Sequence, residues 1–197
     1  MIELDYLPGA TPIDADEMGA LIPEIHFQSE LNQWERSNIE AAINWAKKSR
    51  TLRKNLVTLV GIKLLHEKMF SKVWQWAGNF RTTDKNIGVA SYQLQEEVHK
   101  LCDDLRYQID QGVENWDLLA VTFHHRLVLI HPFPNGNGRH ARLWTDFLLM
   151  YNGQKALSWG YTEELSGEQI RNNYINALKA ADIGDMSPLY LFATGEH

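Results

Sequence analysis

Apolar residues recur at helical spacing along most of the chain after its first thirty residues. The clearest run consists of Trp116, Leu119, Ala120, Phe123, Leu127 and Ile130, and it ends directly before a histidine. The full pattern predicts helices near residues 30–50, 52–76, 94–111, 115–130, 138–152, 166–181 and 187–194. Proline and glycine at positions 8, 9 and 12 predict an irregular arm over residues 1–28, and residues 29–197 predict a single, mostly helical domain.

Residues 131–142, with the sequence HPFPNGNGRHAR, join two of these predicted helices. His131 lies at the C-terminal end of the first helix. The second helix has an apolar face made of Leu143, Trp144, Phe147, Leu148 and Tyr151. Arg139 and Arg142 are three residues apart, so they share another flank of that helix and point the same way.

This segment combines the groups that phosphate chemistry needs. Gly136 and Gly138 let the backbone approach an anion at a helix N-terminus, where the helix dipole is positive, and Asn137 adds a side-chain amide. Arg139 and Arg142 can clamp two further phosphate groups through charge-assisted bonds. An imidazole near its usual pKa can accept a proton at neutral pH. The segment therefore predicts a site for a di- or triphosphate with His131 as its general base.

The same residues resemble the signature of the Fic family, H-x-F-x-[D/E]-G-N-G-R-x-x-R. The match comprises His131, Phe133, Gly136, Asn137, Gly138, Arg139 and Arg142. Three further stretches extend the resemblance over nearly the whole chain, namely residues 64–66, 76–81 and 188–189. Residues 31–35 and the Pro132–Asn135 form of the loop look like the subfamily labelled mobile mystery protein B.

The resemblance implies an all-α Fic fold, a helical bundle with a short β-hairpin flap over the active site. It also implies transfer of AMP, or another nucleoside monophosphate, from ATP to a Ser, Thr or Tyr hydroxyl of a target protein. By carry-over, His131 deprotonates the hydroxyl, the amides of residues 136–138 hold the α-phosphate, Arg139 grips the β-phosphate and Arg142 orients the γ-phosphate. Phe133 would be the buried anchor of the loop.

Asn135 departs from the family pattern, which has a Mg²⁺-binding carboxylate at this position. An amide can ligate a hard cation through its carbonyl oxygen, but it brings no negative charge. We therefore expect weakened Mg²⁺ binding, with the ion held mainly by nucleotide phosphates and water.

Residues 80–92 place turn-forming residues beside short β-prone ones, which predicts a hairpin. In Fic proteins a flap of this kind covers the active site and holds an extended segment of the target by strand pairing. The resemblance assigns Ile87, Gly88 and Val89 to its inner edge. From residue type alone, an ordinary loop between helices is favoured, and only the place of the segment in the family pattern reverses that preference.

Many Fic proteins also carry an inhibitory helix with the motif [S/T]-x-x-x-E-[G/N], whose glutamate pairs with the second arginine of the signature. The nearest match here is Arg36 to Ala41, which makes Glu40 a candidate partner of Arg142. Glu40 fits equally as a solvated helix residue or as part of a capping pair with Ser37. A separate regulatory partner protein is a further possibility.

Composition and charge narrow the classes of partner and the cellular location that we expect for this protein. The chain has 197 residues, of which 19 are basic and 25 acidic, a net charge of −6 with no basic block, so we expect no direct binding to nucleic acid. The lone Cys102 excludes an intramolecular disulfide. Without a signal-like N-terminus or an apolar run of about 18 residues, we expect a cytoplasmic protein with no membrane segment.

Three other interpretations compete with this one. Four histidines cluster in sequence, at positions 124, 125, 131 and 140, but their spacing lacks a metal-site pattern. A non-catalytic nucleotide-binding or interaction module would explain Asn135, although such a module needs no base at His131. A Fic relative that removes AMP, or transfers another phosphate-containing group, would use the same residues.

Overall fold

The computed structural model describes residues 15–195, and within that range the regular structure is helical. The elements are α1 (Ala15–Met18), α2 (Gln28–Ala46), α3 (Arg50–Asn55), α4 (Leu59–Phe70), the 3₁₀ turn η1 (Ser91–Gln93), α5 (Leu94–Gln111), α6 (Trp116–Ile130), α7 (Asn137–Tyr151), α8 (Gly167–Asp182) and α9 (Ser187–Thr194). The predicted all-α class is confirmed. Of the predicted N-terminal arm, residues 1–14 lie outside the described part of the chain, and the remainder contains α1.

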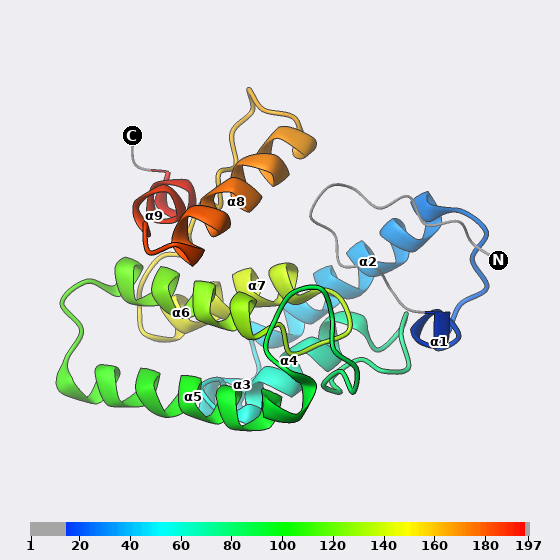
Figure 1. Cartoon of the computed structure of the whole chain (residues 1–197), viewed down its shortest axis with the longest axis horizontal. Coiled ribbons are helices and arrows are strands. Elements are labelled where there is room, and N and C mark those ends of the chain that lie inside the picture. Colours follow the sequence, from blue (N-terminus) through cyan, green and yellow to red (C-terminus); the bar gives the residue numbers. More distant parts are fainter. Residues whose placement is uncertain (1–14, 196–197) are drawn as a thin grey trace.

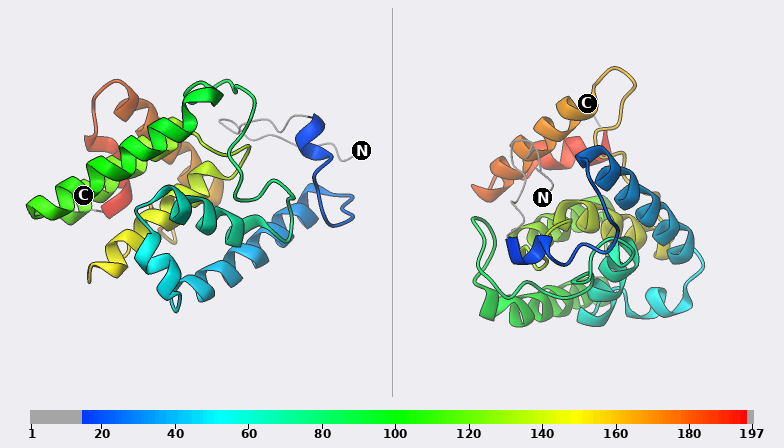
Figure 2. Two further views of the ribbon diagram at one scale, coloured as in Figure 1. Left: turned by 90° about the horizontal axis from the view of Figure 1, so that it is seen from below. Right: turned by 90° about the vertical axis from the view of Figure 1, so that its right-hand side faces the viewer.

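Helices α6 and α7 lie side by side at the centre of the molecule (Figure 1). The main core surrounds them and includes fully buried aromatic rings from α4, α6 and α7, among them Phe70, Phe123, Trp144 and Phe147. Helix α2 packs along α4 (Figure 2), and α5 packs against α6. Helices α8 and α9 form a smaller core against α6, centred on Tyr174 and Leu189.

The ends of α6 and α7 set the geometry of the predicted site. Helix α6 begins at Asn115, whose side chain accepts a hydrogen bond from the backbone N–H of Leu118 (2.9 Å). It ends at His131, which adopts the left-handed conformation (φ 53°, ψ 59°) and turns the chain away. Helix α7 then begins after Gly136, which is also left-handed (φ 78°). Two left-handed residues thus place the C-terminus of one helix beside the N-terminus of the next.

The single helix predicted over residues 52–76 is wrong. The chain forms α3 and α4 instead, because Thr58 is extended and its hydroxyl caps α4 by accepting from the N–H of Gly61 (3.1 Å). Close packing explains the glycine, since a Cβ there would lie 1.9 Å from the carbonyl oxygen of Asn55. Helix α4 stops at Phe70, and Trp74 forms an antiparallel β-bridge with Leu21.

The predicted β-hairpin over residues 80–92 is also wrong. Residues 81–90, here called the flap segment, form a loop without strands. The reason is Arg81, whose buried guanidinium donates to the carbonyl oxygens of Thr83 (2.8 Å) and Val89. One side chain therefore closes the loop where cross-strand backbone pairs would close a hairpin.

No helix within residues 15–195 is both long and apolar enough to span a bilayer.

Candidate functional site

The loop between α6 and α7, residues 131–136, is held from inside by buried side chains. The ring of Phe133 is fully buried, as the resemblance to the Fic family implied. The Asn137 side chain clamps the same residue, because its Oδ1 accepts from the Phe133 N–H (2.9 Å) and its Nδ2 donates to the Phe133 carbonyl (2.8 Å). The amide predicted to bind nucleotide is thus engaged in shaping the loop, which leaves its backbone N–H as the group that can face a phosphate.

His66 on α4 contacts this loop at Phe133 and Asn135. Sequence reasoning did not assign it this role. Its ring stacks on Phe133 with the centroids 3.7 Å apart. Its Nε2 donates to the carbonyl oxygen of Asn135 (3.1 Å), while its Nδ1 accepts from the N–H of Gly78 (3.0 Å). Burial holds the pKa of His66 well below its usual range, which keeps the ring neutral with one donating and one accepting nitrogen.

His131 itself is buried at the end of α6. Burial lowers its pKa to about 4, and the nearby positive charges of Arg81 and Lys85 act in the same direction. The imidazole is therefore neutral at pH 7 and can accept a proton. Its backbone is fixed as well, because the His131 carbonyl accepts from Nε of Arg81 (2.7 Å).

The flap segment lies directly against His131. Gly88 has a positive φ (97°), and a Cβ there would come within 2.7 Å of the His131 Cβ. The N–H of Val89 donates to the carbonyl of Ile130 (3.3 Å), and Val89 packs against the core, whereas the Ile87 side chain is exposed. Two of the three predicted flap residues therefore face the end of α6 and the third faces outward.

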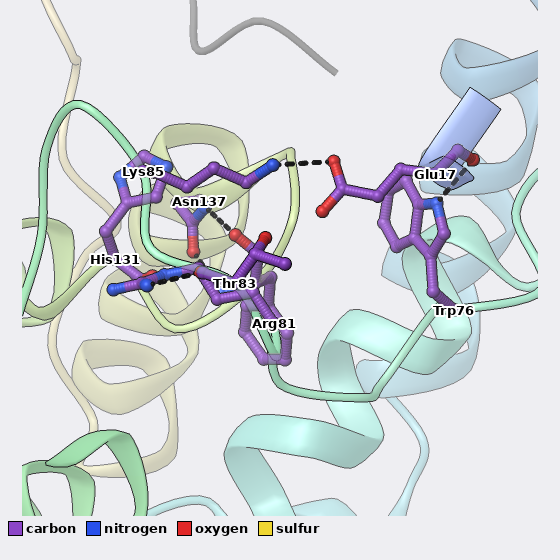
Figure 3. A network of polar contacts seen from close by, with 8 residues as sticks. Glu17, Trp76, Arg81, Thr83, Lys85, His131 and Asn137 are labelled. Atoms are coloured by element: carbon purple, nitrogen blue, oxygen red, sulfur yellow. Dashed lines mark hydrogen bonds and ion pairs between the residues drawn. The ribbon is translucent and has the colours of Figure 1, made fainter. Parts of the chain in front are cut away.

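A nearly buried ion pair spans the space beside His131. Lys85 extends from the flap segment past the imidazole to Glu17 of α1 (Figure 3), with 2.8 Å between Nζ and Oε2. The two side chains are 4% and 15% exposed. The Trp76 indole donates to the Glu17 carbonyl (3.3 Å), which anchors α1 in turn. Sequence patterns gave no signal for this pair, whose members are 68 residues apart.

The N-terminus of α7 leaves backbone N–H groups that could bind an anion. Its first intrahelical hydrogen bond runs from the N–H of His140 to the carbonyl of Gly136 (2.9 Å), so the amides of residues 137–139 have no carbonyl partner within the helix. Gly136 sits on the Phe70 ring, 2.6 Å from where a Cβ would lie. A glycine is thus required at the point where the backbone must turn toward a ligand.

Arg139 follows on the first turn of α7, half exposed, with its guanidinium carbon 5.0 Å from the centre of the Phe70 ring. It forms an ion pair with Glu35 of α2, with 2.6 Å between Nη1 and Oε2. Glu35 is buried and also accepts from the Trp74 indole (2.8 Å). Beside Arg139 lies a hollow of about 300 Å³ lined by Asn32, Arg36, Ile39, Glu40 and Arg139 itself.

Arg142 lies one turn further along, with its guanidinium carbon 4.8 Å from the centre of the Tyr174 ring on α8. The predicted pairing of Glu40 with Arg142 does not occur. Glu40 bonds instead to Arg36 on its own helix (3.2 Å), and its side chain is 62% exposed. Within residues 15–195 the carboxylate that forms an ion pair with a signature arginine is that of Glu35, and its partner is the first of them, Arg139.

The donor set does not fit a Mg²⁺ site built on protein ligands. The Oδ1 atom of Asn135 faces Nη2 of Arg139 at 3.3 Å, a cationic neighbour that disfavours a second cation. Within residues 15–195 no three His, Cys, Asp or Glu side chains converge in a way that could hold a metal ion.

A larger hollow of about 820 Å³ runs along α4 and residues 74–79, and none of the predicted site residues is among those that line it.

Residues 56–149, which begin directly after α3, extend into α7 and include the whole loop, match the family model described as Fic/DOC family. This chain carries a Fic domain. The protein adenylyltransferase fic-1 of Caenorhabditis briggsae is 30% identical over 116 residues, which cover 57% of this chain and 21% of that relative. The chain thus spans about a fifth of the length of the curated relative that it matches.

Solved structures agree with this assignment of the fold. Fic-1 (residues 134–508) from Caenorhabditis elegans has a TM-score of 0.71 and 25% identity, with 91% of this chain and 52% of that chain covered. BepC, a VirB-translocated effector protein from Bartonella tribocorum with bound AMPPNP, has a TM-score of 0.68 and 16% identity, with 91% and 96% covered. Nothing in these comparisons separates the mobile mystery protein B subfamily from the rest of the Fic family.

Proposed function

We propose that this Fic domain transfers AMP from ATP to a Ser, Thr or Tyr hydroxyl of a target protein. The observation that carries the proposal is the joint position of two features in one short loop. A buried, neutral imidazole at His131 follows α6, and the amides that begin α7 start six residues later, on the same helix as Arg139 and Arg142. Two comparisons support a nucleoside triphosphate as the donor. Relatives of this chain are named protein adenylyltransferases, and the similar structure of BepC contains bound AMPPNP.

In the proposed step the target hydroxyl attacks the α-phosphorus of ATP. His131 accepts the hydroxyl proton as the new oxygen–phosphorus bond forms, and the bond to the pyrophosphate leaving group breaks. Amides at the start of α7 hold the α-phosphate. The two signature arginines offset the charge that develops on the pyrophosphate. The residues around Asn135 do not form a magnesium site by themselves.

The low pKa of His131 is compatible with this role. The pKa of about 4 results from burial and from the charges of Arg81 and Lys85, with no anion bound beside the ring. A bound polyphosphate brings negative charge close to the ring, which favours the imidazolium and raises its pKa toward the range where a general base works best. Burial, together with the positive charges of Arg81 and Lys85, keeps the imidazole unprotonated until that anion arrives.

The flap segment supplies the side of the site where a target would lie. Gly88 brings the backbone against His131, and Ile87, the residue before it, presents an exposed apolar side chain that faces outward. A target segment lying along Ile87 would bring its hydroxyl near the imidazole. The identity of that target protein is set by contacts other than those of the catalytic loop.

We propose that Glu35, and not Glu40, restrains this activity. The Glu35 carboxylate occupies the guanidinium of Arg139, the group that would otherwise bind a phosphate. An anionic ligand must compete with that carboxylate before Arg139 can contribute fully. Glu35 is held by Trp74 from its other oxygen, so the restraint is built into the packing of α2 on α4.

The test uses ATP labelled at the α-phosphate, a cell lysate as the source of targets, and three forms of the chain: wild type, His131→Ala and His99→Ala. His99 is an exposed histidine on α5 and serves as the matched control. Loss of the base should reduce label transfer by about 10²- to 10⁴-fold, while ATP binding is largely kept. Transfer by His99→Ala should equal that of wild type.

Equal transfer by wild type and His131→Ala would exclude His131 as the base. Binding of ATP without transfer by any form, in lysates and in auto-modification assays, would favour the nucleotide-binding module over the enzyme. Release of label from a modified target, without incorporation, would favour removal of AMP.

A further inference from the structure

Tyr174 on α8 lies beside two residues of the Fic signature, although it is not part of that signature. The guanidinium carbon of Arg142 is 4.8 Å from the centre of its ring. A Cβ on Gly138 would lie 3.5 Å from its hydroxyl oxygen and 3.6 Å from its Cε1. One buried side chain of α8 is therefore placed against both the first turn of α7 and the second signature arginine.

The two signature arginines are held by different kinds of contact. Arg139 donates to the Glu35 carboxylate (2.6 Å), for which an anionic ligand must compete. Arg142 lies over an aromatic ring, whose negative face attracts a cation. A contact of this kind restrains the guanidinium but uses none of its N–H donors, so it is compatible with the binding of a phosphate.

The Tyr174 hydroxyl is fixed by a buried hydrogen bond, with 3.0 Å between its oxygen and Nε2 of His124 on α6. Thr145 donates its hydroxyl hydrogen to the carbonyl of Ala141 (2.8 Å), so its oxygen is left to accept from Nδ1 of His124 at 3.5 Å. Nε2 is then the acceptor and the Tyr174 hydroxyl the donor. Burial lowers the pKa of His124 to about 3 and raises that of Tyr174 to about 12, which keeps both rings neutral.

Two further rings pack on this pair. The Trp159 ring lies 4.5 Å from the His124 ring, and the Phe192 ring of α9 lies 5.7 Å from the Tyr174 ring, between centroids. Movement of Tyr174 would break its hydrogen bond and disturb these ring contacts. The tyrosine ring is therefore a fixed surface for the longer and more flexible arginine side chain.

We infer that Tyr174, held by His124, is a positioning residue that keeps Arg142 oriented for the γ-phosphate of a nucleoside triphosphate. This inference rests on the proposed function, in which the signature arginines bind the pyrophosphate end of the nucleotide. A restrained arginine loses less rotamer freedom when it binds its ligand, so restraint increases affinity. The effect of Tyr174 should fall on a triphosphate and spare a diphosphate.

The experiment measures binding without catalysis. Dissociation constants are determined by calorimetry for the α,β-methylene analogues of ATP and ADP, in which the bond that AMP transfer breaks is replaced by a stable carbon bridge. The forms compared are wild type, Tyr174→Leu, Tyr174→Phe, Arg142→Ala, the double variant Tyr174→Leu with Arg142→Ala, and Tyr190→Leu. Tyr190 on α9 packs against the same small core, so it is the matched control for loss of a tyrosine ring there. Thermal unfolding of each form reports its stability.

Tyr174→Leu should reduce the preference for the triphosphate over the diphosphate by about threefold or more, because the cation–π contact is lost. Tyr174→Phe should keep most of the preference, since its ring still faces the guanidinium. Tyr190→Leu should lower thermal stability yet keep the preference of wild type. In the Arg142→Ala background, Tyr174→Leu should change the preference by less than about twofold, because the side chain through which the ring acts is gone.

A second measurement needs no variant of Tyr174. In NMR spectra of wild type, the side-chain protons of Arg142 should be shifted upfield by the ring current of Tyr174. Their signals are identified by their loss in Arg142→Ala. The upfield shift should persist when the triphosphate analogue binds, and it decides the question alone if Tyr174→Leu does not fold.

An unchanged preference in Tyr174→Leu would overturn the inference, as would equal binding of the two analogues by wild type. An equal effect of Tyr174→Leu with and without Arg142 would overturn it too, because Tyr174 would then act only through the fold of α8. Loss of the upfield shift on binding would show that Arg142 leaves the ring. Failure of wild type to bind either analogue would overturn both the inference and the proposed function, whereas binding by wild type with no effect of Tyr174 overturns the inference alone.

Discussion

His131 and Arg139 are only eight residues apart, yet their surroundings differ in burial and in the kind of contact. His131 is 6% exposed and is enclosed by the flap segment, Arg81 and the loop that Phe133 anchors. The Arg139 side chain is 37% exposed and touches its partners mainly through charge. One half of the site, the base side, is part of the core. The other half, the arginine side, is a half-exposed electrostatic surface.

This difference predicts different consequences of substitution. On the base side, a change removes packing or leaves a buried polar group unsatisfied, so we expect the free energy of unfolding to fall together with activity. On the arginine side, solvent screens the charges and little apolar area is lost, so we expect ligand affinity to change while stability is nearly kept.

The largest effect is expected for Phe133→Ala on the base side. The ring is fully buried between His66, Phe80 and His140, so its removal should lower the free energy of unfolding by about 3–5 kcal/mol. Urea unfolding followed by circular dichroism measures this change. Tyr107→Ala, at an exposed position on α5, is the control and should cost under about 0.5 kcal/mol. Similar costs for both would mean that the loop is not anchored in the core.

Arg81→Met should destabilise the chain by about 2–4 kcal/mol. The substitution keeps apolar bulk but leaves three buried or half-buried carbonyl groups, of His131, Thr83 and Val89, without the guanidinium that they accept from. Faster amide exchange at Val89 would report release of the flap segment. Arg106→Met, which breaks only an exposed pair with Asp103, should leave stability and exchange unchanged.

Acid should unfold the chain through its buried histidines. Burial lowers the pKa of His124 and His140 to about 3 and that of His131 to about 4, below the value of about 6.5 in an unfolded chain. The unfolded state therefore binds more protons as pH falls below 6.5, so stability is complete above that pH and is lost below it.

The size of this loss of stability in acid depends on how many buried groups change their protonation on unfolding. Asp146 partly offsets the histidines, because burial raises its pKa to about 6 and it takes up a proton in the folded state. We expect a net loss of about 2–3 kcal/mol between pH 6.5 and 5.5. Urea midpoints at a series of pH values measure it. A flat stability profile from pH 7 to pH 5 would contradict the buried, neutral state of these rings.

Local sequence was sufficient for the parts of the site that neighbours in the chain determine. The ends of α6 and α7 and the common flank of the two signature arginines follow from spacing within about forty residues, whereas the burial of Phe133 is implied by the resemblance to the Fic family. Contacts between distant residues gave no such signal. Glu35 and Arg139 are 104 residues apart, and the flap segment lacks strands because a single buried side chain, Arg81, takes carbonyls that strands would share.

Glu35→Gln tests the arginine side and should have the smallest effect on stability. Glutamine keeps an oxygen that accepts from the Trp74 indole, but it lacks the negative charge that pairs with Arg139. We therefore expect the free energy of unfolding to fall by about 1 kcal/mol or less. Because the carboxylate no longer competes for Arg139, ATP should bind about tenfold more tightly and auto-modification should rise. Glu40→Gln is the matched control on the same helix, since Glu40 pairs only with exposed Arg36, and it should change neither quantity. Weaker ATP binding in Glu35→Gln would mean that Glu35 positions Arg139 for the nucleotide and does not restrain it. A rise in activity with Glu40→Gln alone would return the restraint to the position that the sequence first indicated.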